Sequence, residues 1–88
     1  MDFLTIIKTL ENSTKLTRRI VNTNNGETIS YKTKTTTNIT INNTTTIQNI
    51  IQTCLKPKNN EIYLYINYAT RRNNKKYKIE DITSLTIT

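Results

Sequence analysis

Residues 29–79 read ISYKTKTTTNITINNTTTIQNIIQTCLKPKNNEIYLYINYATRRNNKKYKI, and this stretch decides the expected fold. Two runs with strand-like alternation come first, an amphipathic helical run follows, and a further alternating run leads into a basic turn. Nine of the thirteen Lys and Arg residues lie within it. The order of these runs predicts a small β-β-α-β-β layer with cationic loops.

The helical run is predicted from the spacing of its apolar residues. Relative positions 0, 3, 4, 7 and 8 form one stripe on an α-helix, and they are occupied by Ile47, Ile50, Ile51, Cys54 and Leu55. Proline disfavours helical dihedrals in the residue before it, so the following Pro57 should end the helix. Cys54 lies within the stripe, which predicts a core residue rather than a reactive thiol.

The first two runs predict a hairpin of two strands. Ile29 and Tyr31 alternate with Lys32, so a strand here would turn its lysines away from its apolar side. Ile39 and Ile41 repeat the alternation. Residues 35–37 are therefore the expected connection between two paired strands.

The run from Glu61 to Tyr68 predicts a strand with two different faces. Its even positions from Ile62 onward are apolar or aromatic, whereas Tyr63 and Tyr65 lie on the opposite face. These two rings could pack, pair across strands, or stack on nucleic-acid bases. A basic turn then leads into a returning strand that contains Tyr77, and residues 82–87 predict an edge strand or an ordered tail.

The segment before residue 29 adds a second helix and a turn. Phe3, Ile6, Ile7 and Leu10 share one helical face, and Asp2 can cap the helix start. Residues 22–26, which include the only glycine, form the strongest turn signal. The predicted fold class is therefore α+β, a small antiparallel sheet with two helices packed on one face, in a single domain of residues 1–88.

The charge favours a polyanionic partner. The formal net charge is +7, and residues 56–78 hold seven basic residues and one acid, a formal +6. Nucleic acid is preferred to a membrane surface, because no apolar run could span a bilayer and Lys8 is the only cation of the N-terminal helix. A cytosolic location is expected. The predicted RNA-binding residues are Lys15, Arg18, Arg19, Lys32, Lys34, Lys56, Lys58, Arg71, Arg72, Lys75, Lys76 and Lys78.

Catalysis is not expected. The chain has no His, one Cys and no glycine-rich phosphate loop. Glu80 and Asp81 are adjacent, so their carboxylates tend to point apart. No Cys/His set predicts a zinc site. We therefore expect no catalytic residues, no metal, no cofactor and no small-molecule substrate.

The order of these segments resembles the eukaryote-specific family of large-subunit ribosomal protein twenty-two. The resemblance implies a non-catalytic structural component of the cytosolic large ribosomal subunit, docked on ribosomal RNA beside neighbouring subunit proteins, without homo-oligomers. The polar face of the expected helix is Gln, Asn and Thr, so its RNA contacts should lie at Lys56 and Lys58. The matching segments are DFLTIIKTL (2–10), KLTRRI (15–20), ETISYKTKTTTNITIN (27–42), IIQTCLKPKNN (50–60) and YLYINYATRRNNKKYKI (63–79).

Two alternatives stay open. The run of two strands, a helix and further strands after residue 28 also looks like the β-grasp of ubiquitin-like proteins. With no Gly-Gly terminus, that alternative reduces to a protein-interaction module. A small viral or plasmid-encoded protein that binds a host nucleoprotein is the other, supported by size and charge.

Overall fold

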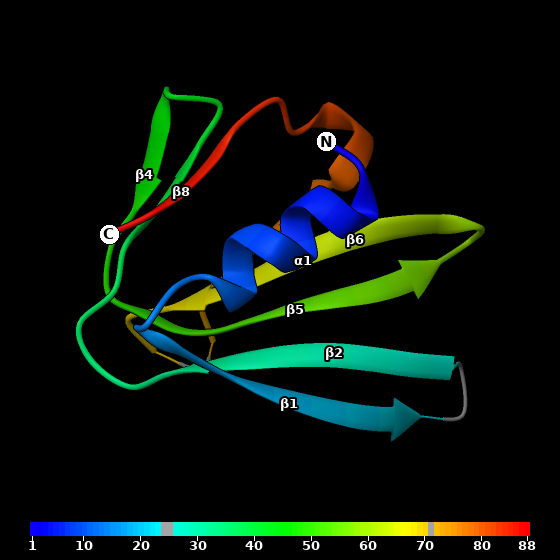
Figure 1. Cartoon of the computed structure of the whole chain (residues 1–88), viewed down its shortest axis with the longest axis horizontal. Helices are drawn as coiled ribbons and strands as arrows, with labels where there is room; N and C mark the ends of the chain where they lie inside the picture. Colours follow the sequence, from blue (N-terminus) through cyan, green and yellow to red (C-terminus); the bar gives the residue numbers. More distant parts are fainter. Residues whose placement is uncertain (24–25, 71) are drawn as a thin grey trace.

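The computed structural model describes the backbone of residues 1–23, 26–70 and 72–88, and the side chains of residues 1–18, 28–70 and 72–88. Figure 1 shows one α-helix in front of a broad sheet, with a smaller sheet beside the helix. The elements in chain order are α1 (Phe3–Glu11), β1 (Leu16–Thr23), β2 (Gly26–Thr33), β3 (Ile39–Ile41), β4 (Thr45–Ile47), β5 (Ile50–Lys58), β6 (Glu61–Tyr68), β7 (Asn74–Lys78), the 3₁₀ turn η1 (Ile79–Asp81) and β8 (Leu85–Ile87).

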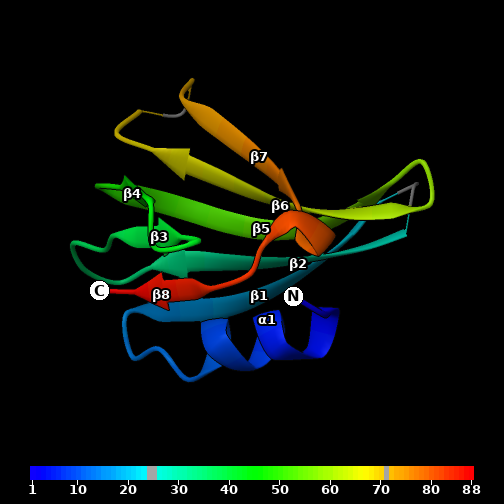
Figure 2. The same cartoon turned by 90° about the horizontal axis from the view of Figure 1, so that it is seen from above.

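The strands form two antiparallel sheets. The larger sheet has the order β1-β2-β5-β6-β7, and the smaller one has the order β4-β3-β8. Seen from the two directions of Figures 1 and 2, α1 and the smaller sheet lie on the same side of the larger sheet. The molecule therefore has two layers, with the helix and the small sheet forming the second layer together.

The predicted helix over residues 47–55 is wrong, and with it the fold class of two helices packed on one face of a sheet. These residues end β4 and form most of β5, the central strand of the larger sheet. The second layer contains one α-helix and a second sheet instead. The ribosomal resemblance and the β-grasp alternative had both used this helix.

The helical spacing arises from two breaks in strand alternation. Asn49 has a φ of 57° and separates β4 from β5, so Ile47 and Ile50 belong to different sheets. A register shift follows between Ile50 and Gln52, which moves the buried positions to Thr53 and Leu55. Cys54 is buried from the other face. The apolar residues therefore come from strand segments that alternate differently, and only their combined spacing matches that of one helical face.

The predicted hairpin of the first two runs is also wrong in its pairing. Both runs are strands, β2 and β3, but residues 35–37 carry the chain from one sheet to the other. Ile39 pairs with Ile47 of β4 and with Ile87 of β8. The last strand, β8, is therefore an edge strand, which confirms one of the two expectations for residues 82–87. It belongs to the small sheet.

The N-terminal helix is confirmed. The Asp2 carboxylate accepts a hydrogen bond of 2.7 Å from the backbone N–H of Thr5, which caps the helix start and lowers the pKa of Asp2. Ile6 and Leu10 are fully buried. They belong to one core cluster with apolar residues of both sheets. Among the described residues, no helix has the length and apolar character needed to cross a membrane.

Asparagine makes the left-handed turns of this chain. Six non-glycine residues of the described backbone have positive φ values, and five of them are Asn. Asn tolerates this region better than most residues, because its short polar side chain can bond locally. Asn59 and Asn60, both with positive φ, form the two-residue turn between Lys58 and Glu61, as a type I′ hairpin requires.

Candidate nucleic-acid interface

The two faces of the larger sheet differ in what covers them. Residues that pair directly across antiparallel strands point to the same face. Tyr31, Leu55 and Leu64 lie on the face that supports α1 and the small sheet, and each is almost fully buried. The side chains between them point to the opposite face, here called the open face. On β2, β5, β6 and β7 its residues are Lys32, Gln52, Cys54, Lys56, Lys58, Glu61, Tyr63, Tyr65, Asn67, Asn74, Lys76 and Lys78, together with Thr28 and Ser30.

Two tyrosines lie at the middle of the open face. Tyr63 and Tyr65 are on β6, flanked on both sides by β5 and β7. Their ring centroids are 6.3 Å apart and the ring planes are inclined by 53°. The prediction that these rings lie opposite Ile62, Leu64 and Ile66 is confirmed. Both rings remain partly exposed.

A lysine ammonium lies over each ring. The Nζ of Lys76 is 5.0 Å from the centroid of Tyr63, and the Nζ of Lys56 is 5.2 Å from that of Tyr65. Both distances fall within the range of cation–π contacts, which at exposed sites contribute about 0.5–1 kcal/mol. The two lysines are exposed. Their ammonium groups are therefore held loosely beside the rings and accessible to an anion.

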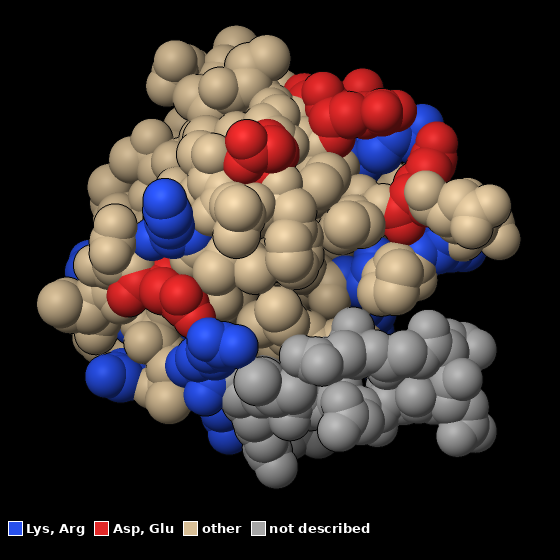
Figure 3. Space-filling model, turned by 45° about the vertical axis from the view of Figure 1, so that its right-hand side comes forward, with Lys and Arg blue, Asp and Glu red and all other residues tan. Residues whose placement is uncertain are grey.

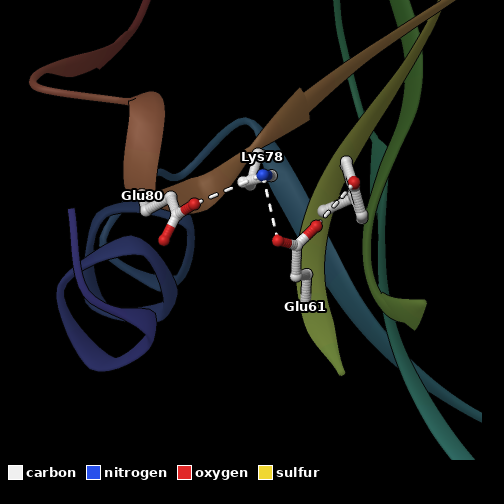
Figure 4. Close-up of polar contacts among 4 residues, drawn as sticks. Glu61, Lys78 and Glu80 are labelled. Atoms are coloured by element: carbon white, nitrogen blue, oxygen red, sulfur yellow. Dashed lines mark hydrogen bonds and ion pairs between the residues drawn. The ribbon is translucent and has the colours of Figure 1, made fainter. Parts of the chain in front are cut away.

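Glu61 organises one end of this surface. One of its carboxylate oxygens accepts a hydrogen bond of 2.9 Å from the Tyr63 hydroxyl, and the other lies 3.0 Å from the ammonium of Lys78. The Glu80 carboxylate reaches the same ammonium at 3.3 Å (Figure 4). These contacts orient the Tyr63 ring, and they neutralise the charge of Lys78.

The same contacts shift three pKa values. The hydrogen bonds from Lys78 and Tyr63 hold the pKa of Glu61 below its ordinary range. The hydrogen bonds to Glu61 and Glu80 raise the pKa of Lys78, and the bond to Glu61 raises the pKa of Tyr63. At neutral pH, Glu61 is therefore ionised while Lys78 and Tyr63 keep their protons.

On the open face, small side chains lie between the longer ones. Ser30 and Cys54 pair directly across β2 and β5, and both are buried. Gln52 donates a hydrogen bond of 2.5 Å from its amide to the Ser30 hydroxyl. Burial raises the pKa of the Cys54 thiol, which keeps it protonated and unreactive. The predicted burial of Cys54 is thus confirmed, although its neighbours are strand residues.

Four of the predicted RNA-binding residues lie on the open face with exposed side chains: Lys32, Lys56, Lys58 and Lys76. Lys78 shares this face but is held by Glu61 and Glu80. Lys56 and Lys58 were expected at the end of a helix, and they lie on β5 instead. The structure therefore places on one sheet face cations that come from three different strands.

Two further predicted residues have partners within the protein. Arg18 pairs with Glu11 of α1 at 2.6 Å, and its position opposite Tyr31 places it on the covered side of the sheet. The Lys15 ammonium donates to the Thr88 carbonyl. Both contacts tie β1 or the residues before it to other segments, which indicates a role in holding the fold.

The remaining predicted residues point to the covered side, lie beyond the ends of the strands, or fall outside the described part. Lys75 pairs with Ile66 and therefore points to the covered side at the sheet edge. Lys34 follows β2 and Arg72 lies in the turn before β7, and both are exposed. Arg71 and the side chain of Arg19 lie outside the described residues, as do residues 24 and 25 of the predicted turn.

Charges are mixed elsewhere on the surface. In the view of Figure 3, outside its grey region, acidic side chains lie next to basic ones. Among the described residues, Arg18 of β1 and Glu11 of α1 form an ion pair. In the part of this view that is not grey, positive charges therefore have negative charges beside them.

The metal-ligating side chains of the described residues do not cluster. No group of three or more His, Cys, Asp or Glu side chains among them could hold a metal ion. The buried thiol of Cys54 has a raised pKa. Glu61 is ionised, and its carboxylate is bonded to Lys78 and Tyr63. The open face is suited to binding by charge and ring stacking.

Glu61 is the residue of this surface that the sequence prediction missed. Its position two residues before Tyr63 on an alternating strand places both on one face. That spacing was the available signal, but Lys78 and Glu80 come from distant positions in the chain.

No protein-family model matches this sequence, and no curated protein or solved structure matches it significantly.

Proposed function

We propose that this chain is a non-catalytic RNA-binding protein and that the open face of its larger sheet is the binding surface. The observation that carries the proposal is that exposed Lys32, Lys56, Lys58 and Lys76 share one sheet face with two partly exposed tyrosine rings, over which Lys56 and Lys76 lie. Neutralising phosphates with lysine ammonium groups releases counterions from the nucleic acid, which favours binding. Aromatic rings among these cations add contacts that a purely phosphate-binding surface lacks.

The net charge supports a polyanionic partner independently of the geometry. The chain carries a formal +7, and three of its acids, Glu11, Glu61 and Glu80, are engaged in ion pairs with Arg18 or Lys78. The open-face lysines other than Lys78 have no carboxylate within ion-pair distance among the described residues. Their full charge is therefore available to an RNA backbone.

The test is a titration of a fluorescently labelled RNA oligonucleotide with the full chain at several salt concentrations. If the four lysines contact phosphates of a single strand, the logarithm of the binding constant should fall with the logarithm of the salt concentration with a slope of about −3. A variant with Lys32, Lys56 and Lys76 changed to Gln should bind more weakly with a flatter slope. Unchanged, salt-independent binding by this variant would disprove the proposal.

The ribosomal form of the proposal is narrower. A structural role in the cytosolic large ribosomal subunit rests on the resemblance of segment order, and the replacement of the expected helix by β5 removes one of the matching segments. Sedimentation of cell lysate through a sucrose gradient tests it directly. The protein should move with the large subunit, and its absence from those fractions would contradict the ribosomal assignment while leaving RNA binding to the titration.

A further inference from the structure

We infer that Tyr63 and Tyr65 form two stacking positions for unpaired bases, so that the open face selects single-stranded over double-stranded nucleic acid. This inference rests on the proposed function and names the form of nucleic acid that the surface takes. It concerns the two rings, whereas the proposed function concerns the lysines. The two can therefore fail separately.

The first argument is the position of the rings within the sheet. Tyr63 and Tyr65 lie on β6, which has β5 on one side and β7 on the other. A helix or a two-stranded ribbon can enter the major groove of DNA, and the major groove of an RNA helix is narrower still. A sheet face several strands wide fits neither groove. Bases can reach these rings only if they are unpaired and turned toward the sheet.

The spacing of the rings supports the same conclusion. Successive bases along one strand of a helix are separated by about 3.4 Å. The two ring centroids are 6.3 Å apart, and their planes are inclined by 53°. Two adjacent bases that remain stacked on each other could not each stack on one of these rings. The geometry fits an extended strand whose neighbouring bases are separated, the form that single-stranded binding proteins hold.

The lysines over the rings are part of the arrangement. Lys56 and Lys76 occupy the space above Tyr65 and Tyr63 where a base would lie. A stacked base displaces the ammonium from the ring, and a phosphate of the same strand offers it a stronger charged partner. Each lysine ammonium can thus move from its contact with a ring to a contact with a phosphate of the bound strand while it stays on the open face.

The two rings differ in how they are held. Glu61 accepts the hydrogen bond of the Tyr63 hydroxyl, so this ring is oriented before a ligand arrives. For Tyr65, no side-chain hydrogen bond is formed within the described part of the chain, and its ring is positioned by Lys56 and by the strand itself. The orientation of the Tyr63 ring is therefore fixed before a base binds, whereas the Tyr65 ring can change its orientation on binding.

The experiment compares three ligands of equal length for the full chain: single-stranded oligouridine, an RNA duplex, and an abasic oligonucleotide that keeps the phosphates without bases. Wild-type protein should bind the single strand more tightly than either of the others. Tyr65→Leu and Tyr63→Leu should each weaken single-strand binding roughly 5- to 150-fold, the range for loss of one stacked base. The abasic ligand should be bound equally by wild type and both variants.

Tyr65→Phe and Tyr63→Phe are the matched controls, because they keep the ring and should bind the single strand within about threefold of wild type. They also keep the test valid if a Leu variant fails to fold, and ring-proton NMR shifts of the wild-type tyrosines on adding oligouridine give an independent readout. Equal affinity for single strand, duplex and abasic ligand, with unshifted ring protons and a retained salt slope, would overturn the inference and leave the proposed function standing. Absence of binding to all three ligands would overturn both.

Discussion

Lys76 lies directly across from Tyr65 in the pairing of β7 with β6, yet its ammonium is over the ring of Tyr63, 5.0 Å from the centroid. Lys56 shows the reverse arrangement: it pairs with Tyr63 and lies over Tyr65. Each lysine therefore crosses the sheet diagonally to a ring two residues along. Such diagonal neighbours are within reach of long side chains, and the result is a surface of alternating cations and rings.

This arrangement predicts that Lys76 contributes to RNA binding through its charge. Changing Lys76 to Gln should reduce the steepness of the salt dependence by about 0.7, the value for one phosphate contact with a single strand. Lys8→Gln is the control, because Lys8 is an exposed cation of α1 and its loss changes the net charge equally. Affinity measured at several salt concentrations checks the prediction. An equal change of slope in both variants would mean that net charge, and not the position of Lys76, determines binding.

Glu61 is predicted to restrain RNA affinity, because it neutralises Lys78 on the open face. Changing Glu61 to Gln should increase affinity, since Lys78 then keeps only Glu80 as a partner and the surface gains one positive charge. The Gln oxygen can still accept the hydrogen bond from Tyr63. Asp81→Asn makes the same change of net charge at an exposed position outside the open face. A titration in which Asp81→Asn strengthens binding as much as Glu61→Gln would contradict the local explanation.

The pair of Glu61 and Lys78 also predicts a pH window for stability. The pKa of Glu61 is lower in the folded chain than its ordinary value of 4.5, so its contribution is present above that value and is lost as the pH falls through the folded pKa. The pKa of Lys78 is raised above 10.5, so its contribution is present below that value and is lost only in stronger alkali. Both groups are partly exposed to solvent, so the expected effect is small.

Thermal unfolding of wild type and Glu61→Gln between about pH 3 and pH 8, a range that extends below and above the ordinary carboxyl pKa, checks this window on its acid side. Wild type should have the higher Tm at neutral pH, and the difference should shrink as Glu61 becomes protonated. A difference in Tm that is the same at pH 3 and pH 7 would show that the Glu61 charge has no part in it.

Asn42 is predicted to be the main polar anchor of the small sheet. Its side-chain oxygen accepts hydrogen bonds from the backbone N–H groups of Thr83 and Ser84, at 2.6 and 3.2 Å, and its amide donates to the carbonyl of Asp81 at 3.1 Å. Asn42→Ala should lower the free energy of unfolding by about 1–3 kcal/mol, since several backbone groups lose a partner.

Asn43→Ala is the matched control for this substitution. Asn43 has nearly the same φ, 57° against 55° for Asn42, so both variants carry a similar cost of placing Ala in the left-handed region. The side chain of Asn43 is exposed and makes no hydrogen bond within the described residues. Urea denaturation should therefore show a larger loss for Asn42→Ala. Equal losses would attribute the effect to backbone conformation alone.

The elements with regular alternation or a clear helical stripe were predictable from the sequence. The spacing of Phe3, Ile6 and Leu10 predicted α1, and the run from Glu61 to Tyr68 predicted β6 with the two faces that the structure shows. These segments carry their own pattern without interruption. A local pattern was sufficient because each of them buries one continuous face.

β5 could not be identified in this way, because a left-handed residue and a register shift break its alternation. Two signals nevertheless favoured a strand. Residues 44–47 and 50–53 are rich in Thr and Ile, which lose side-chain freedom in a helix. Asn59-Asn60 also stands between two runs with strand character, and a two-residue Asn turn is typical of a hairpin. Pro57 lies in β5 beyond the pairs with β2, so its missing N–H costs no ladder hydrogen bond there.

The division of strands between two sheets was beyond local patterns. β2 and β3 are both correct as strands, but whether they pair depends on β5 and β8, which are distant in the chain. The same holds for the site: the two faces of β6 were predicted, whereas the lysines that join Tyr63 and Tyr65 depend on the register of β5 and β7. Contacts between distant segments therefore determine both which sheet each strand joins and which lysines lie beside the two tyrosines.

The pairing of Ile39 with Ile87 has a consequence for how the protein folds. The small sheet takes β3 and β4 from the middle of the chain and also includes β8, the last described strand, so forming it requires the long segment between β4 and β8 to close into a loop. Closing such a long loop is entropically costly and slows folding. The small sheet lies on the covered side of the larger sheet, opposite the face that carries Tyr63 and Tyr65. The layer behind the open face therefore depends on the pairing of segments that are distant in the chain.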